Sequence, residues 1–573
     1  MSMEIDIYQK ESDDQYIDWK GRNANPKIHG GIRAAAFACV VEVLTNMVFI
    51  CNASNFVTYF TKSMHYPPAK SANMVTNFMG TSFLLTILGG FISDSLFTRF
   101  TTFILSCIIE LLGLILLTIQ SHSTRLRPAL NLQPSQSQAA FLYTGIYSVA
   151  AGAAGINANL PAHGADQLDH SNQRQISAFF NWFFFSLCTG GLISATVMVW
   201  VEENKGWNWS FPITVIVLCL ALFIFISGSP FYRHKRPTGS ALTRIIKVLT
   251  YAARNWKASP NQRLGNQYAV AALNLNRADG DHKFKFLDKA LIDNRVTAAE
   301  VKETRTFIGL LPIFASTIMM NCCLAQLQTF SVVQGSIMNR KLHNFEIPTP
   351  SLNVIPLIIM LSSIPLYERL YSGKNIIFKP LWRMGLGLAL ASGSMAVAAL
   401  VEAKRRAEAA DNNVMSVFWL GWQFLLLGVS DMLTLGGMLE FFYSEAPSSM
   451  RSMCTALSWC STSMGYFLSS FLVSIVNSVS GSYGKEWLGG MNMNHGRLDL
   501  FYTLLSILNS LNFLNYMYWA RRFFIKQHYE SSMQLKLSLL HLYGSTIMMS
   551  FALHNFRHSV WHKGARRTEK QYM

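Results

Sequence analysis

The stretch GIRAAAFACVVEVLTNMVFICNASNFVTYFT, which runs from Gly31 to Thr61, decides the fold. It is mostly apolar and exceeds the roughly 20 residues that a helix needs to cross a bilayer. One ionisable side chain, Glu42, lies well inside it, and Thr45 and Asn46 follow one turn later. Because positions three and four apart share a helix face, these three side chains are expected to point the same way. The stretch therefore predicts a membrane-spanning helix with one polar face.

A carboxylate at Glu42 needs polar surroundings. Even lenient insertion scales assign at least about 2.5 kcal/mol to a charged side chain at the centre of a membrane helix. We expect Glu42 to face a water-filled cavity, which makes it a candidate functional residue. The alternative is a structural carboxylate that only ties helices together.

The composition is that of an integral membrane protein. Of 573 residues, 51% are hydrophobic and 14% are charged, whereas soluble proteins carry about 25% charged residues. The net charge of +17 indicates basic cytoplasmic loops beside an anionic leaflet. No compact basic domain with interleaved aromatic residues is present, so nucleic acid is not an expected partner. The nine cysteines lie in apolar segments without metal-ligand spacing, which predicts packing and no metal site.

About twelve segments are apolar and long enough to span a membrane. They are expected near residues 31–61, 72–92, 101–120, 140–160, 176–201, 211–229, 306–334, 351–367, 384–401, 415–443, 452–476 and 500–520. The expected organisation is an N-terminal segment (1–30), a six-helix bundle (31–230), a linker (231–305), a second six-helix bundle (306–522) and a C-terminal extension without an assigned role (523–573). Two six-helix halves around a linker are typical of a secondary transporter with its substrate site near the midplane.

The charge of the linker predicts how the chain is oriented in the membrane. It carries fifteen Lys or Arg residues against six Asp or Glu, which predicts that it lies in the cytoplasm. An even number of crossings then places the N-terminus in the cytoplasm, and the C-terminus follows. The same linker is where a regulatory kinase would act.

Several motifs carry a family resemblance. They are SANMVTNFMGTSFLLTILGGFISD (Ser71–Asp94), HGADQLD (His163–Asp169), FNWFFFS (Phe180–Ser186), AQLQTFSVVQG (Ala325–Gly335) and LEFFYSEAPSSMRS (Leu439–Ser452). In these the chain resembles the plant nitrate/peptide transporters (NRT/PTR), a branch of the proton-coupled oligopeptide transporters. Within that family it is most similar to the branch that contains abscisic-acid importers, in the stretches Asn321–Val332 and Ser430–Ser452.

The resemblance implies an all-α integral membrane protein with the major-facilitator fold, in which twelve transmembrane helices form two six-helix bundles. It implies a transporter and no enzyme, driven by the proton gradient without a bound cofactor. The expected partners are a small-molecule substrate and the lipid bilayer. The expected location is the plasma membrane, with the vacuolar membrane as the alternative.

The chain departs from the family pattern at positions that usually carry charged side chains. The first helix of the family usually carries ExxER, but here Thr45 and Asn46 follow Glu42 in place of the second acid and the base. A lysine usual in the fourth helix is replaced by Asn157. Removing one partner of a buried ion pair costs about 3–5 kcal/mol, whereas replacing both can be nearly neutral. The sequence thus predicts a stable but altered site. Several of the charged side chains that take part in proton coupling in the family are absent from it.

The expected substrate cavity is correspondingly poor in cations. Leu324 occupies the position of a histidine that contacts the anion in nitrate-handling relatives, so nitrate is disfavoured. Peptides are disfavoured because the base of ExxER is missing. Asp431 lies deep in an apolar stretch, and we expect Glu42 and Asp431 to carry the coupled proton and to hydrogen-bond a carboxylic acid while protonated. Asn321 and Gln326 are expected to face the same cavity together with Thr45, Asn46 and Asn157, although polar side chains also hold membrane helices together.

The residues expected to act in conformational gating are Asp94, Arg99, Glu445 and Arg451. Asp94 and Arg99 resemble the loop that braces helices between states in major-facilitator transporters. Glu440 and Glu445 approach the end of their helix close to Arg451, where we expect an ion pair at the mouth.

Three functions follow from these observations. The leading hypothesis is a plasma-membrane importer of an amphipathic weak acid, with abscisic acid as the first substrate to test. The second is a transporter of nitrate or another small anion. The third is a transport-defective membrane sensor that binds a ligand and signals through the linker.

Overall fold

The fold was analysed in a computed structural model, which describes most of the chain. The described residues are 16–25, 28–66, 68–129, 132, 134–169, 172–237, 241–257, 284–293, 295–342, 345–346, 352, 354–371, 380–483, 487–488 and 496–525. The middle of the expected linker (258–283) and nearly all of the C-terminal extension (526–573) lie outside these residues.

The first half of the fold contains helices α2 to α8. Their bounds are α2 (Gly31–Lys62), α3 (Pro68–Ser95), α4 (Arg99–His122), α5 (Gln136–Asp166), α6 (Gln173–Ile193), α7 (Val199–Lys205) and α8 (Trp207–Ser227). A π-helical turn (Ser194–Met198) joins α6 to α7, so these form one span. Side chains fix where several helices begin: Thr98 caps α4, and Ser135 with Gln138 forms a capping box at α5.

The second half contains the helices after the linker. They are α11 (Ala298–Gln328), α12 (Phe330–Ser336), α13 (Val354–Tyr371), α14 (Pro380–Ala410), α15 (Gly421–Glu445), α16 (Arg451–Ser482) and a helix over residues 498–525. The single span expected at residues 306–334 is interrupted at Thr329, which separates α11 from α12.

The expected all-helical membrane fold is confirmed. Among the described residues, ten helical segments are long and apolar enough to cross a membrane, and the apolar helix Val354–Tyr367 is shorter. A further long helix covers residues 498–525.

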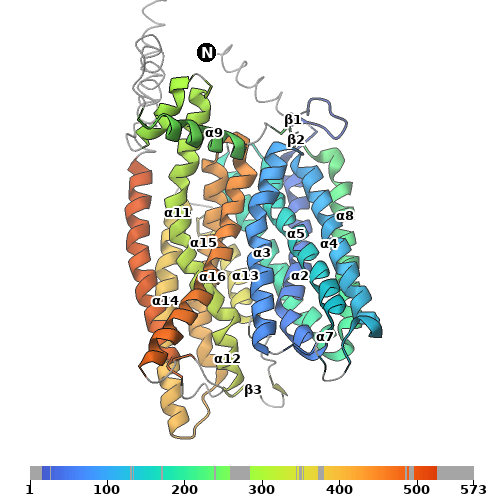
Figure 1. The fold of residues 1–573 in the computed structure, drawn as a ribbon, viewed down its shortest axis with the longest axis vertical. Coiled ribbons are helices and arrows are strands. Elements are labelled where there is room, and N and C mark those ends of the chain that lie inside the picture. Colours follow the sequence, from blue (N-terminus) through green and yellow to red (C-terminus); the bar gives the residue numbers. More distant parts are fainter. Residues whose placement is uncertain are drawn as a thin grey trace, which may run out of the picture. The chain divides into compact units, whose positions relative to one another are not determined.

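The two halves pack closely against each other. Figure 1 shows α3 beside α16, and a Cβ added to Gly90 of α3 would come within 2.9 Å of the backbone of Met453 in α16. The rings of Phe83 and Trp459 stack at 5.6 Å between the same helices. A second contact joins α6 to α13, where Cys188 donates to Met360. Glycine at position 90 therefore lets the two halves approach at backbone distance.

Two short strand pairs lie outside the helices. Strand β1 (Tyr16–Ile17) pairs antiparallel with β2 (His234–Lys235), and β3 (Lys341–Leu342) pairs with β4 (Phe345–Glu346). Figure 1 shows β1 and β2 at the end of the first half where α3 ends and α4 begins. We call this end, defined by the loop between Ser95 and Arg99, the Arg99 end.

The chain divides into two compact units. The first comprises Met1–Ile246 and Glu303–Met517 and holds the contacts between the two halves. The second comprises Lys247–Lys302 and Tyr518–Met573. Within the second unit, Asn255 at the end of helix α9 (Ala241–Arg254) donates to the backbone of Lys289, in a 3-10 helix (Lys285–Asp293).

Candidate functional site

Arg99 is the centre of a buried charged network at the Arg99 end. Its guanidinium pairs with Asp94 of α3 at 3.2 Å and with Asp166 at the end of α5. It also donates to the hydroxyl of Ser452, in the first turn of α16. Tyr443 of α15 donates to the second oxygen of Asp166 at 2.7 Å. One arginine of the first half thus connects two carboxylates of its own half to two hydroxyls of the other.

Arg383 is the centre of a second network. It lies in the first turn of α14, is 2% exposed, and pairs with Glu440 of α15 at 2.9 Å. The same guanidinium donates to the side-chain oxygen of Asn181 in α6 at 2.7 Å, and Ser177 of α6 donates to Glu440 at 3.1 Å. The ring of Tyr367 lies 4.9 Å from the guanidinium. This arginine of the second half therefore reaches across to the first.

The two networks are related by the repeat of the fold. Each arginine stands at the start of the third helix of its half and pairs with a carboxylate near the end of the fourth helix. Each also binds a polar side chain in the fifth helix of the opposite half, which is Ser452 for Arg99 and Asn181 for Arg383. Because the bonds run between the halves, separating the halves at this end must break both networks.

Glu42 lies in α2, 1% exposed, and no hydrogen bond or ion pair of its carboxyl is found among the described residues. Thr45 donates to the backbone of its own helix, and Asn46 donates to the backbone oxygen of Leu187 in α6 at 2.7 Å. The amide of Asn46 is therefore used in packing α2 on α6. Gly190 allows that contact, since a Cβ there would come within 2.4 Å of the oxygen of Val43.

Asp431 lies in the middle of α15 and is 9% exposed. It too has no hydrogen-bond or ion-pair partner within the described part of the chain. Glu42 and Asp431 thus come from opposite halves, on helices that both contact α6, α2 at Leu187 and α15 at Ser177.

The remaining residues expected in a cavity divide into two groups. Asn321 donates to Ser461 of α16 at 3.0 Å, and Gln326 donates to Ser469 at 2.9 Å, so both tie α11 to α16. Asn157 of α5 and Leu324 of α11 are half-buried. Among the described residues, no basic side chain is found in a hydrogen bond with Asn157, Asn321 or Gln326.

The expected ion pair at the mouth, between Glu440 or Glu445 and Arg451, stays a prediction. Glu440 pairs with Arg383, because α14 begins beside the end of α15 and places the arginine within 2.9 Å. The guanidinium of Arg451 lies 5.0 Å from the ring of Tyr443. Glu445 ends α15 and is half-buried.

Sequence reasoning gave no role to Asn181, Arg383, Asp166 or Tyr443. The motifs HGADQLD, FNWFFFS and LEFFYSEAPSSMRS contain three of these residues, but no spacing in the sequence joins them. Arg383 lies 202 residues from its partner Asn181. Only the repeat of the six-helix pattern could have suggested a second arginine equivalent to Arg99.

Two helical halves joined by reciprocal buried charge networks define a class, a multi-pass membrane transporter. The family model described as "PTR2: POT family" matches residues 100–488. Protein NRT1/PTR FAMILY 4.2 of Arabidopsis thaliana is 55% identical over 523 residues, covering 90% of this chain and all of the relative. Protein NRT1/PTR FAMILY 4.6 of the same plant is 42% identical over 568 residues, covering 89% and 96%. The chain therefore belongs to the POT family of transporters, in its plant NRT1/PTR group.

Solved structures agree on the fold. The chain resembles the POT family transporter PepTSo with a TM-score of 0.62 and 19% identity, covering 86% of this chain and 98% of that one. An auto-inhibited POT family peptide transporter gives a TM-score of 0.62 at 20% identity, covering 86% and 97%. The expected major-facilitator fold is confirmed, and the chain is a transporter and no enzyme.

Proposed function

We propose that this transporter imports an amphipathic weak acid together with a proton, and that abscisic acid is the first substrate to test. The observation that carries the proposal is the pair Glu42 and Asp431. Both carboxyls are buried on opposite halves of the fold, on helices that contact α6, and neither pairs with a cation in the described part of the chain.

Buried carboxyls without a cationic partner are suited to binding a weak acid together with a proton. A carboxyl without a cationic partner in a membrane helix is stabilised in its protonated form, which can donate a hydrogen bond. A protonated Glu42 or Asp431 can therefore bind a carboxylate or carbonyl oxygen of a ligand, while apolar surroundings favour a hydrocarbon ring. Proton release would then weaken the bond and couple the proton to the substrate.

The side chains described above are less suited to binding a small hydrated anion. Nitrate needs a countercharge or several donors to leave water. The buried arginines Arg99 and Arg383 already neutralise carboxylates, and an apolar side chain, Leu324, stands in α11. These contacts favour a weak acid with an apolar body over nitrate.

The orientation and location belong to the same proposal. The excess of Lys and Arg in the linker supports a cytoplasmic linker and cytoplasmic termini. The Arg99 end would then be the cytoplasmic end of a transporter in the plasma membrane. The two arginine networks close that end, and transport requires them to break and reform as the halves rock.

The test is uptake of labelled abscisic acid into cells that express the wild type, Glu42→Gln or Asp431→Asn. Each substitution is expected to reduce saturable uptake by about 10-fold or more, because it removes a titrating group from the site. Glu110→Gln is the matched control, since Glu110 is also a buried carboxyl but lies in α4, packed against α5. It should leave uptake unchanged.

The outcomes separate the hypotheses. An equal loss of saturable uptake in all three variants would show that any buried carboxyl matters. It would contradict the role assigned to Glu42 and Asp431. Saturable binding of abscisic acid by the purified protein without uptake would favour the sensor. Saturable nitrate uptake without abscisic-acid uptake would favour the small-anion transporter.

A further inference from the structure

Helices α3 and α16 lie against each other along the interface between the two halves. Beyond the approach of Gly90 to Met453, Ser463 of α16 donates to the backbone oxygen of Gly80 in α3 at 2.8 Å. The ring of Phe467 fills the space that a Cβ at Gly80 would need. The two helices are therefore in close contact from Met453 to Phe467 of α16.

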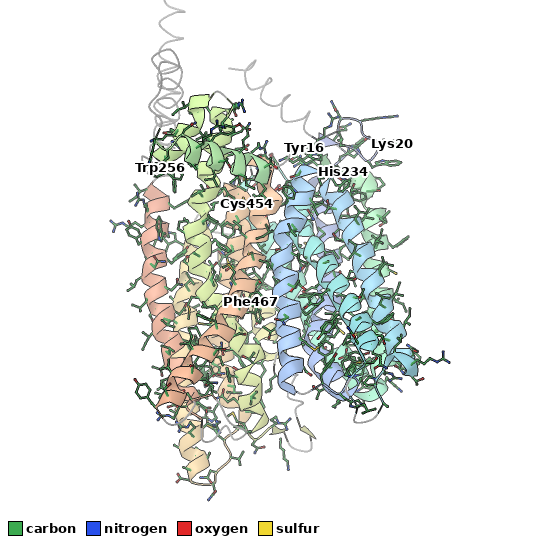
Figure 2. The ribbon with its side chains drawn as sticks, in the orientation of Figure 1. Tyr16, Lys20, His234, Trp256, Cys454 and Phe467 are labelled. Atoms are coloured by element: carbon green, nitrogen blue, oxygen red, sulfur yellow. The ribbon has the colours of Figure 1, made fainter. Side chains whose placement is uncertain are left out.

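Trp459 lies within this interface. Its ring stacks on Phe83 of α3, with the ring centres 5.6 Å apart and the planes 4° from parallel, and Trp459 is 6% exposed. Figure 2 shows Cys454 of α16 near the Arg99 end and Phe467 about half-way along the helices, and Trp459 lies between them in the sequence of α16. Trp459 thus lies between the halves and towards the midplane, where transporters of this architecture bind their substrates.

The indole N–H of Trp459 is a buried donor for which no acceptor is found within the described part of the chain. An indole nitrogen can only donate, and leaving a buried donor without an acceptor costs free energy. Buried tryptophans usually have a hydrogen-bond partner. A bound ligand that supplies the acceptor would account for this unused donor.

A row of rings connects Trp459 with the first membrane helix. Phe83, on which Trp459 stacks, also contacts Phe49 of α2, with the ring centres 5.6 Å apart. Phe49 lies seven residues after Glu42, and positions seven apart share a helix face. The rings of Phe49, Phe83 and Trp459 therefore lead from the face of α2 that carries Glu42 to α16.

The side chains next to Asp431 reach the same place. Met432 and Leu433 of α15 are buried in one hydrophobic cluster with Phe83 and Trp459. A water molecule bound to the indole N–H would need two to four polar partners, whereas these neighbours are apolar. An acceptor group carried by an apolar ligand suits the donor better.

We propose that the indole N–H of Trp459 donates a hydrogen bond to the carboxyl group of the transported acid, while the rings of Phe49 and Phe83 contact its apolar body. This inference rests on the proposed function and adds a donor that carries no charge and does not titrate. The site is closed in this structure, since Trp459, Glu42 and Asp431 are all buried, and the acid reaches it when the halves move apart. A donor of this kind selects against an analogue that lacks the acceptor oxygen.

The experiment measures the binding of three labelled weak acids (abscisic acid, indole-3-acetic acid and benzoic acid) to purified full-length protein in lipid nanodiscs. Trp459→Phe keeps a ring against Phe83 but removes the N–H. It is expected to raise the Kd of each acid that the wild type binds about 10-fold, as for the loss of one buried hydrogen bond to a carboxyl group.

Trp207→Phe is the matched control. Trp207 begins α8 and packs on Tyr59 and Phe211, so its contacts lie within the first half. The Kd should stay at the wild-type value in this variant. Thermal unfolding of each variant without ligand verifies that it is folded.

A wild-type Kd in folded Trp459→Phe would overturn the role of Trp459 and leave the proposed function standing. An equal rise in Trp207→Phe would also overturn it, since the effect would then not come from the N–H of Trp459. Saturable binding of none of the three acids by the wild type would overturn both this inference and the proposed function. Should Trp459→Phe fail to fold, Trp459→Tyr, which also lacks the indole N–H, decides in the same way.

Discussion

At the scale of single residues, the main feature is a pair of buried arginines that form ion pairs with carboxylates. Arg99 binds two carboxylates and Arg383 binds one, all of them less than 10% exposed. A buried pair of this kind contributes modestly as a whole, but removing one partner leaves the other charge without compensation. Single substitutions in these networks should therefore act more strongly than paired ones.

Glu440→Gln is expected to destabilise the protein by about 3–5 kcal/mol, because Arg383 loses its buried counter-charge. The double variant Glu440→Gln with Arg383→Met should recover most of this loss. The measurement is thermal unfolding of the purified protein, with the exposed acid Asp411 changed to Asn as control. If the double variant is no more stable than Glu440→Gln, the ion pair is not the reason for the loss.

His234 makes stability at the β1–β2 pair depend on pH. Burial lowers its pKa to about 4, and the nearby charges of Asp18 and His29 act in opposite directions. The unfolded histidine takes up a proton below about pH 6.5, so between about pH 6.5 and pH 4 the unfolded chain binds more protons and stability falls as the pH falls.

The expected loss from His234 is about 2 kcal/mol on going from pH 7.5 to pH 5. His234→Phe keeps an aromatic ring against Phe100, which lies 4.9 Å away, but cannot take up a proton. Thermal unfolding of both proteins at the two pH values is the measurement. An equal loss in wild type and variant would show that other groups cause the pH dependence.

At the scale of the elements, close approach of helices sets the position of the halves. Gly90 of α3 faces the backbone of α16, where a Cβ would meet Met453 at 2.9 Å. Backbone atoms cannot yield as a flexible side chain does, so a methyl group must push the helices apart. The closed Arg99 end should be sensitive to this one contact.

Gly90→Ala is expected to weaken closure of the Arg99 end by about 1–3 kcal/mol and to reduce transport. Gly393→Ala in α14 is the matched control, since a Cβ there meets no atom within 4 Å. Labelling of the buried thiol of Cys454 in α16 by a membrane-impermeant maleimide and substrate uptake are the two measurements. Equal behaviour of the two variants would mean that helix propensity, and not the approach of α3 to α16, decides the result.

At the scale of the whole molecule, the sequence predicted the helices well because membrane spans depend on local length and apolarity. It also placed Asp94 beside Arg99, which are five residues apart across one short loop. It could not place Arg383 of α14 against Asn181 of α6, because that contact joins two helices far apart in the sequence and from opposite halves. It also missed the β1–β2 pair, because two-residue strands leave no pattern in a sequence.

The whole molecule is proposed to carry a weak acid across the membrane together with a proton. The most direct test is uptake of labelled abscisic acid at about pH 5.5 and about pH 7.5 in expressing cells and in empty-vector cells. Weak acids enter cells unaided at low pH, so only the saturable excess over the empty vector counts. The account predicts a saturable excess that is larger at the lower pH, and no saturable excess at either pH would contradict it.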